Sequence, residues 1–176
     1  MSVHRTAIKK ISKQSTFFVT AAAFAAICSS YTVADNANFS GDWTLNEQKS
    51  ELGDFGARIA PKKLKVTQTA DALTADKTSS FNGEERKTTE KITLDGKESE
   101  NTVFGTSKKK STAKWDDNGQ TLSVSSNTAF ERNGETMEIK GTENWKLLDG
   151  GKTLSIETTS VSSRGTFTVK AVYEKS

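Results

Sequence analysis

The chain has 176 residues with 25 Lys or Arg, 22 Asp or Glu, one His and one Cys, a length that suits one domain and a short leader. Residues 1–34 hold four of the basic residues together with His4 and Cys28, so residues 35–176 carry 21 basic and 22 acidic side chains, a net charge of −1. Without excess positive charge, imidazole or thiol, this part lacks the usual means of nucleic-acid binding, Cys or His zinc ligation, thiol redox chemistry and Ser–His–Asp catalysis. We therefore expect no nucleic-acid partner, no metal and no cofactor.

Residues 1–34 have the layout of a secretory signal peptide. A basic start precedes the apolar run 17–27, and small residues lead to Ala34. The apolar run is too short to span a membrane comfortably. We predict cleavage after Ala34 and an exported protein, periplasmic or secreted, without a membrane span. Lipid anchoring through Cys28 is the alternative, although Ile27 stands where lipoprotein signals have a small residue.

Residues 38–45, with the sequence Asn-Phe-Ser-Gly-Asp-Trp-Thr-Leu, predict the first strand of the mature domain. Phe39, Gly41, Trp43 and Leu45 share one parity, so they point to one face of this strand, and the polar residues between them point to the other. The pattern predicts a strand with one buried face.

A short helix is expected between this strand and the next one. Asn46 is a suitable N-cap, Leu52 and Phe55 would face inward, and either Gly53 or Gly56 would end the helix.

From residue 62 onward, apolar and polar residues alternate in short segments separated by turn signals, among them Asn82-Gly83, Asp95-Gly96 and Asn133-Gly134. No segment leaves room for a crossover helix, so neighbouring strands should be antiparallel. We predict an all-β domain at 35–176, a single antiparallel up-and-down β-barrel of about 9–10 strands, because closure removes exposed edges. A β-sandwich is the alternative.

The first strand resembles the Gly-x-Trp opening of the calycins, the superfamily of lipocalins and fatty-acid-binding proteins, at Gly41-Asp42-Trp43. The resemblance implies a lumen that holds a small lipophilic ligand, with Tyr173 among its site residues. Fatty-acid-binding proteins have an Arg-x-Tyr pair for the ligand carboxylate, whereas this chain has Ala171 before Val172 and Tyr173. The chain is also similar to secreted lipocalin-like barrel proteins of bacteria, a membership that implies no activity.

Trp43, Trp115 and Trp145 lie near strand ends, beside turns. We expect these large aromatic side chains to plug one end of the barrel as core, because aromatic residues supply much of the buried apolar area. The alternative is that they line a ligand cavity, and for that reason they are candidate ligand-binding residues.

The inward parity turns from apolar to polar along several strands and includes Lys77, Glu90, Lys109 and Glu143. One interpretation is a hydrated half-lumen in which these charges bind a small amphipathic ligand, which makes Glu90, Lys109 and Glu143 candidate site residues. The other is a one-residue slip of register that returns the four side chains to solvent. The slipped register is our expectation.

Three hypotheses about function follow. The first is an exported, monomeric, non-catalytic protein that holds a small lipophilic or amphipathic molecule in its lumen. The second is an envelope interaction or structural module that binds a protein or a glycan through loops. An enzyme ranks third, because the many hydroxyl groups have no base to activate them.

Overall fold

The computed structural model describes residues 35–81, 83–132 and 134–176. The expected signal peptide, its cleavage site, Asn82 and Asn133 lie outside the described residues. Elements follow in chain order: β1 (Gly41–Leu45), the 3₁₀ helix η1 (Glu47–Lys49), α1 (Gly53–Ile59), β2 (Lys63–Gln68), β3 (Ala72–Phe81), β4 (Glu84–Thr93), β5 (Ser99–Val103), β6 (Ser107–Trp115), β7 (Thr121–Arg132), β8 (Glu135–Leu148), η2 (Asp149–Gly151), β9 (Thr153–Ser162) and β10 (Gly165–Lys175).

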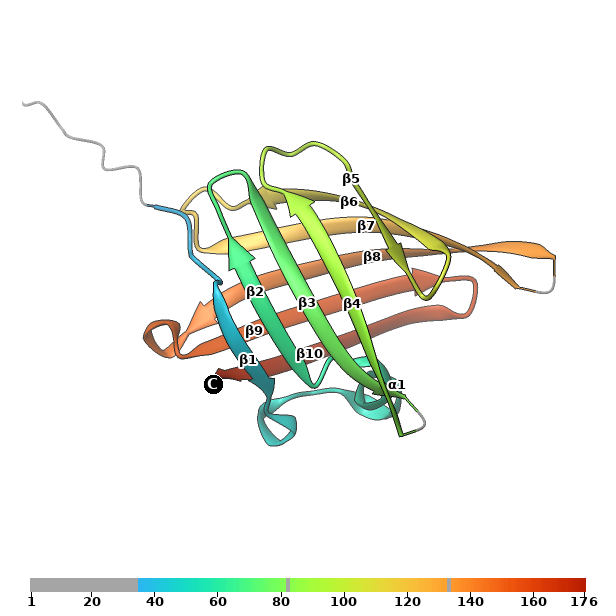
Figure 1. The fold of residues 1–176 in the computed structure, drawn as a ribbon, viewed down its shortest axis with the longest axis horizontal. Coiled ribbons are helices and arrows are strands. Elements are labelled where there is room, and N and C mark those ends of the chain that lie inside the picture. The colour runs from blue at the N-terminus through green and yellow to red at the C-terminus, as the bar shows by residue number, and fades with distance from the viewer. Residues whose placement is uncertain (1–34, 82, 133) are drawn as a thin grey trace, which may run out of the picture. The chain divides into compact units, whose positions relative to one another are not determined.

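The ten strands form one antiparallel sheet in the order β4-β3-β2-β1-β10-β9-β8-β7-β6-β5. Each strand pairs with its neighbour in sequence, except that β4 and β5 do not pair and form the two ends of the sheet. In addition, β1 pairs with β10, where Trp43 lies opposite Lys175. In Figure 1 strands β1–β4 cross in front of β6–β10, as the two walls of a barrel do. The predicted up-and-down barrel is confirmed, and the β-sandwich is wrong.

Side chains bridge the seam between β4 and β5, the two end strands of the sheet. The Asn101 amide accepts a hydrogen bond from the Lys91 backbone N–H at 2.8 Å and donates one to the Lys91 carbonyl at 2.9 Å. Nearby, the Thr93 backbone N–H donates to Ser99 Oγ at 2.9 Å. Asn101 thus takes the place of a backbone partner, so the barrel is nearly closed.

Replacing Asn101 with Ala is expected to open this seam and to lower the free energy of unfolding by about 1 kcal/mol, the net value of exposed hydrogen bonds. Amide hydrogen exchange should accelerate at Lys91 while the amides of β7 and β8 keep their protection. Asn127→Ala, at an exposed position of β7, is the control. Unchanged exchange at Lys91 would contradict the bridging role.

The helical region differs from the prediction of one short helix. Asn46 does act as an N-cap, accepting from the Lys49 backbone N–H, but it caps η1. Gly53, with φ of +57°, begins α1 and does not end it, because its left-handed backbone turns the chain from η1 into the helix. Gly56 does not end α1 either, because the helix continues to Ile59. A Cβ at Gly56 would approach the Val169 side chain to 2.8 Å, so glycine lets α1 pack closely against β10.

The core lies at one end of the barrel, where the three tryptophans gather around Phe39. The Trp43 indole N–H donates to the Phe39 carbonyl at 3.0 Å. The Phe39 ring stacks on Trp115 with centroids 5.7 Å apart and meets Trp145 edge-on at 5.8 Å. The Ala37 backbone N–H donates a hydrogen bond to the Gly119 carbonyl, which holds the N-terminal segment across this end of the barrel. The expected aromatic plug is therefore present, with Phe39 at its centre.

Candidate functional site

A cavity of about 530 Å³ occupies the lumen on the other side of this core. Its size lies within the range of small-molecule sites. The cavity is lined by the end of α1, by the β5–β6 and β9–β10 turns, and by the inward faces of the long strands on both walls. Its lining includes Ile59, Lys77, Glu90, Phe104, Lys109, Ser126, Phe130, Met137, Ile139, Gly141, Glu143, Trp145, Thr158, Ser160, Phe167 and Tyr173.

The inward face of β8 shows how the lumen changes with depth. Trp145, beside the aromatic core, is followed by Glu143, Gly141, Ile139 and Met137, since alternate residues of a strand share one face. The lumen is therefore apolar at its closed end, polar in the middle and apolar again toward the turns near α1.

A cluster of two lysines and two glutamates occupies the polar level; we call it the Lys–Glu cluster. Lys109 Nζ lies 2.8 Å from Glu90 Oε2 and 3.0 Å from Glu143 Oε1. Lys77 Nζ lies 3.0 Å from Glu90 Oε1 and 4.0 Å from Glu143 Oε1. The Trp145 indole N–H donates to the other Glu143 oxygen at 3.1 Å. Strands β3, β4, β6 and β8 each supply one of the four charges.

Glu90, Glu143 and Lys109 are each held in the charged form by the opposite charges beside them. Burial opposes the ionisation of Glu90 and Glu143, but the nearby Lys77 and Lys109 outweigh it and hold both carboxyl pKa values below the ordinary value. Burial also opposes the charge on Lys109, yet Glu143 and Glu90 raise its pKa. The cluster is thus charge-balanced, with every carboxylate oxygen within hydrogen-bond reach of a donor.

Hydroxyl groups continue the polar level on the side away from Trp145. In the strand register Gly141 lies between Ser126 of β7 and Ser160 of β9, while Glu143 lies opposite Thr158. A Cβ at Gly141 would approach Ser126 Oγ to 2.9 Å, so glycine keeps this level open. Burial raises the pKa of the Tyr173 hydroxyl, and Glu143 raises it further, so this phenol stays neutral.

Five of the seven residues predicted as a ligand site line this cavity, namely Glu90, Lys109, Glu143, Trp145 and Tyr173. The other two, Trp43 and Trp115, belong to the aromatic core. The expected register slip is wrong, because the observed pairing turns all four cluster residues inward, with at most 16% of any side chain exposed.

Sequence reasoning missed the apolar level at the outer end of the lumen. Apolar and polar residues do alternate in the sequence around Phe130, Met137 and Ile139, but this alternation alone does not distinguish a lumen wall from a packed core. The cavity that these three side chains line is what distinguishes the two.

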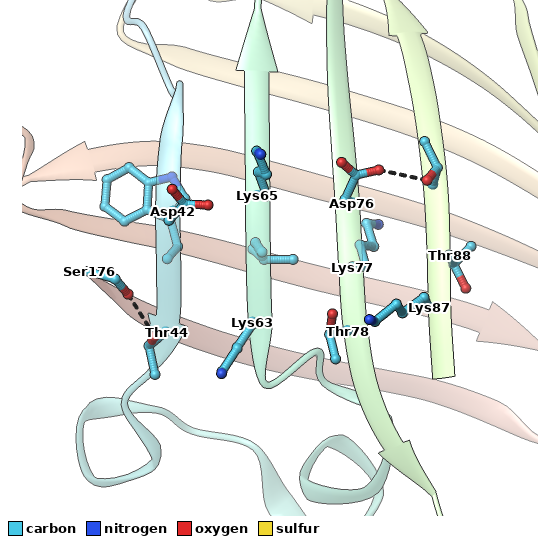
Figure 2. A pocket seen from close by; sticks show the side chains of 13 residues that line it. Asp42, Thr44, Lys63, Lys65, Asp76, Lys77, Thr78, Lys87, Thr88 and Ser176 are labelled. Carbon is cyan, nitrogen blue, oxygen red and sulfur yellow. Dashed lines mark hydrogen bonds between the residues drawn. The ribbon is translucent and has the colours of Figure 1, made fainter. Parts of the chain in front are cut away.

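A second hollow, of about 540 Å³, lies over the outer face of β1–β4. Figure 2 shows charged and hydroxyl side chains there in two cross-strand rows. One row runs Asp42, Lys65, Asp76 and Thr89, and Asp76 accepts a hydrogen bond from Thr89 at 2.6 Å. Because acidic and basic neighbours already alternate along this row, the lumen is the better candidate for a ligand site.

Across residues 35–81, 83–132 and 134–176, no three His, Cys, Asp or Glu side chains are grouped as metal ligands would be. Over the same ranges, no helix combines the length and the apolar character that crossing a membrane requires.

The fold and the lumen together define an antiparallel up-and-down barrel that joins its first and last strands, has helices after the first strand and encloses a cavity. The chain is similar in fold to zebrafish ileal bile acid-binding protein, solved in complex with cholic acid. The TM-score is 0.52 at 20% sequence identity, over 78% of this chain and 98% of that chain. No protein-family model matches the chain, and no curated protein matches it either.

Proposed function

We propose that this chain is an exported, non-catalytic binding protein that carries a small lipophilic or amphipathic molecule in its barrel lumen. The observation that supports this most directly is the lumen cavity of about 530 Å³, whose outer level is apolar and whose inner level is polar. A lumen graded in this way complements a molecule with an apolar body and a polar end.

The Phe104 side chain, in the β5–β6 turn, supports the same proposal. It lines the cavity, yet 78% of it is exposed, and its φ of +49° is unfavourable for a residue with a side chain. Burial does not account for a phenylalanine in such a position, because little of it leaves water. An apolar contact for a ligand that passes this end of the lumen does account for it.

The fold neighbour offers a parallel, since its title names it as a bile acid-binding protein and its crystal contains cholic acid. That protein therefore holds an amphipathic molecule of the kind proposed here. The described part of this chain contributes no imidazole or thiol, and its lumen carboxylates are paired with lysines, which suits carriage more than catalysis.

Blocking the lumen should abolish binding. Ser160 lines the cavity opposite Gly141, so Ser160→Trp places an indole in the open level and is expected to weaken the binding of Nile red, an uncharged lipophilic dye, at least about tenfold. Val161→Trp, on the outer face of the same strand where the side chain is 47% exposed, should bind like the wild type. Fluorescence titration measures both.

Nile red binding that is equal in the wild type and in Ser160→Trp would overturn the lumen as the binding site. Export is tested separately: the N-terminal sequence of the protein recovered from its own host should begin at Asp35, and a protein that keeps residues 1–34 would contradict it.

A further inference from the structure

The lumen offers a ligand two kinds of polar group. The charge balance of one kind and the unpartnered hydroxyls of the other determine which polar end of a ligand fits. The first kind is the Lys–Glu cluster, which contains as many positive as negative charges. The second kind is a set of hydroxyl groups beside it, on Ser126, Thr158 and Ser160. None of these three hydroxyls has a hydrogen-bond partner among the described residues, although each residue is partly buried and lines the cavity.

A charged ligand end gains little from this cluster. An anion close to Lys109 would also lie close to Glu90 and Glu143, which are 2.8 Å and 3.0 Å from the same ammonium nitrogen. A cation close to either carboxylate would meet Lys77 or Lys109 in the same way. Attraction to one member is therefore offset by repulsion from the next, while the ligand charge still loses its hydration.

A hydroxyl group has neither disadvantage. It donates to a carboxylate or serine oxygen and accepts from a lysine ammonium or another hydroxyl, so it matches both kinds of lumen group at once. Several hydroxyls would satisfy Ser126, Thr158 and Ser160, which otherwise lack protein partners. The open level at Gly141 provides the space next to them.

The order of levels along the lumen gives the orientation. The hydroxyl level lies deeper than Ile139, Met137 and Phe130, and Phe104 lies at the outer end. An amphipathic molecule therefore places its polar end inward, against the cluster, and its chain along the outer apolar level.

We propose that the lumen selects an uncharged amphiphile with two or more hydroxyl groups at its polar end, bound polar end first, over fatty acids and amphipathic amines. The proposal rests on the lumen-binding function proposed above and specifies the ligand class for that site. It depends on the charge balance of the Lys–Glu cluster and on the hydroxyls of Ser126, Thr158 and Ser160.

The test compares three twelve-carbon probes on the purified full chain at pH 8: monolaurin, which has two hydroxyls, laurate, which is anionic, and dodecylamine, which is cationic. Displacement of Nile red gives each affinity, with the probes kept below their aggregation concentrations. Monolaurin is expected to bind at least about tenfold more tightly than either charged probe, since a charge must give up hydration without gaining a free partner.

Serine-to-alanine variants test the hydroxyl level without disturbing the charges. Ser126→Ala/Ser160→Ala should weaken monolaurin about tenfold, because two hydrogen bonds are lost. Ser125→Ala/Ser155→Ala, outward on the same two strands, should bind monolaurin like the wild type.

The outcomes separate the two proposals. Laurate or dodecylamine binding as tightly as monolaurin would overturn the ligand class while leaving the lumen-binding function intact. Monolaurin binding that survives in Ser126→Ala/Ser160→Ala would overturn the role of the hydroxyl level. If neither Nile red nor any of the three probes binds the wild type, both proposals fail.

Discussion

Glu143→Gln is expected to lower the free energy of unfolding by about 3–5 kcal/mol at pH 7, because removing one member of a buried ion cluster leaves an uncompensated charge. Glu143 lies within 3.0 Å of Lys109, and only 13% of its side chain is exposed. In the variant, Glu90 alone faces both Lys77 and Lys109. Urea unfolding of the wild type and the variant measures the difference.

The pH dependence of stability follows from the same groups. The folded pKa values of Glu90 and Glu143 are lowered from 4.5, so their contribution is complete above about pH 4.5 and is lost as the pH falls through the folded values. The folded pKa of Lys109 is raised from 10.5, so its contribution is complete below about pH 10.5 and is lost as the pH rises through the folded value. The cluster should therefore stabilise the barrel fully between these limits.

Two variants check that charge balance is the cause. Lys109→Met/Glu143→Gln restores balance between Lys77 and Glu90, so its unfolding free energy should exceed the value expected from adding the two single changes. Glu157→Gln, at an exposed position on the outer face of β9, should have a small effect, within about 0.5 kcal/mol. A Glu143→Gln protein as stable as the wild type would show that the cluster contributes nothing.

The barrel could be predicted because the sequence signals for it are local, each lying within or beside the strand or turn that it predicts. Strand parity and turn residues repeat through the sequence, and they predicted the antiparallel order and the inward direction of Trp43 and Trp145. The turn glycines also agree with the predicted hairpins, since Gly83 and Gly134 both have the positive φ that such turns require. Each of these signals lies within a few residues of the feature that it predicts.

The Lys–Glu cluster could not be predicted with the same security, because its stability is a property of four strands together. Glu143, taken alone on β8, is an unfavourable side chain to bury, and this is why a slipped register was expected. Its partner Lys109 is 34 residues away in the sequence. Only the assembled register shows that each buried charge has an opposite charge within about 3 Å.

The same cluster links the fold to the proposed ligand. The Lys77 and Glu90 strands, β3 and β4, belong to one wall of the barrel, and the Lys109 and Glu143 strands, β6 and β8, belong to the other (Figure 1). The ion pairs therefore join the two walls across the lumen at its polar level. The groups expected to stabilise the barrel are thus also those proposed to meet the polar end of a ligand.

Trp43→Ala is expected to lower the free energy of unfolding by about 3–5 kcal/mol, the cost of deleting a large buried aromatic side chain. Trp43 is 1% exposed and lies in β1 between Leu64 of β2 and Lys175 of β10, so it packs where the first and last strands join. Its indole N–H also donates a hydrogen bond to the Phe39 carbonyl. Thermal and urea unfolding measure the loss.

Trp43→Phe separates packing from the hydrogen bond. It keeps an aromatic ring and removes the indole N–H, so its cost should be smaller, about 1–2 kcal/mol, the value of a buried hydrogen bond whose acceptor is left unpaired. Amide exchange adds a local readout: in Trp43→Ala the amides that join β1 to β10 should lose protection before those that join β7 to β8. A Trp43→Ala protein that melts like the wild type would contradict the view that closure between β1 and β10 depends on this side chain, and with it the physical basis of the lumen.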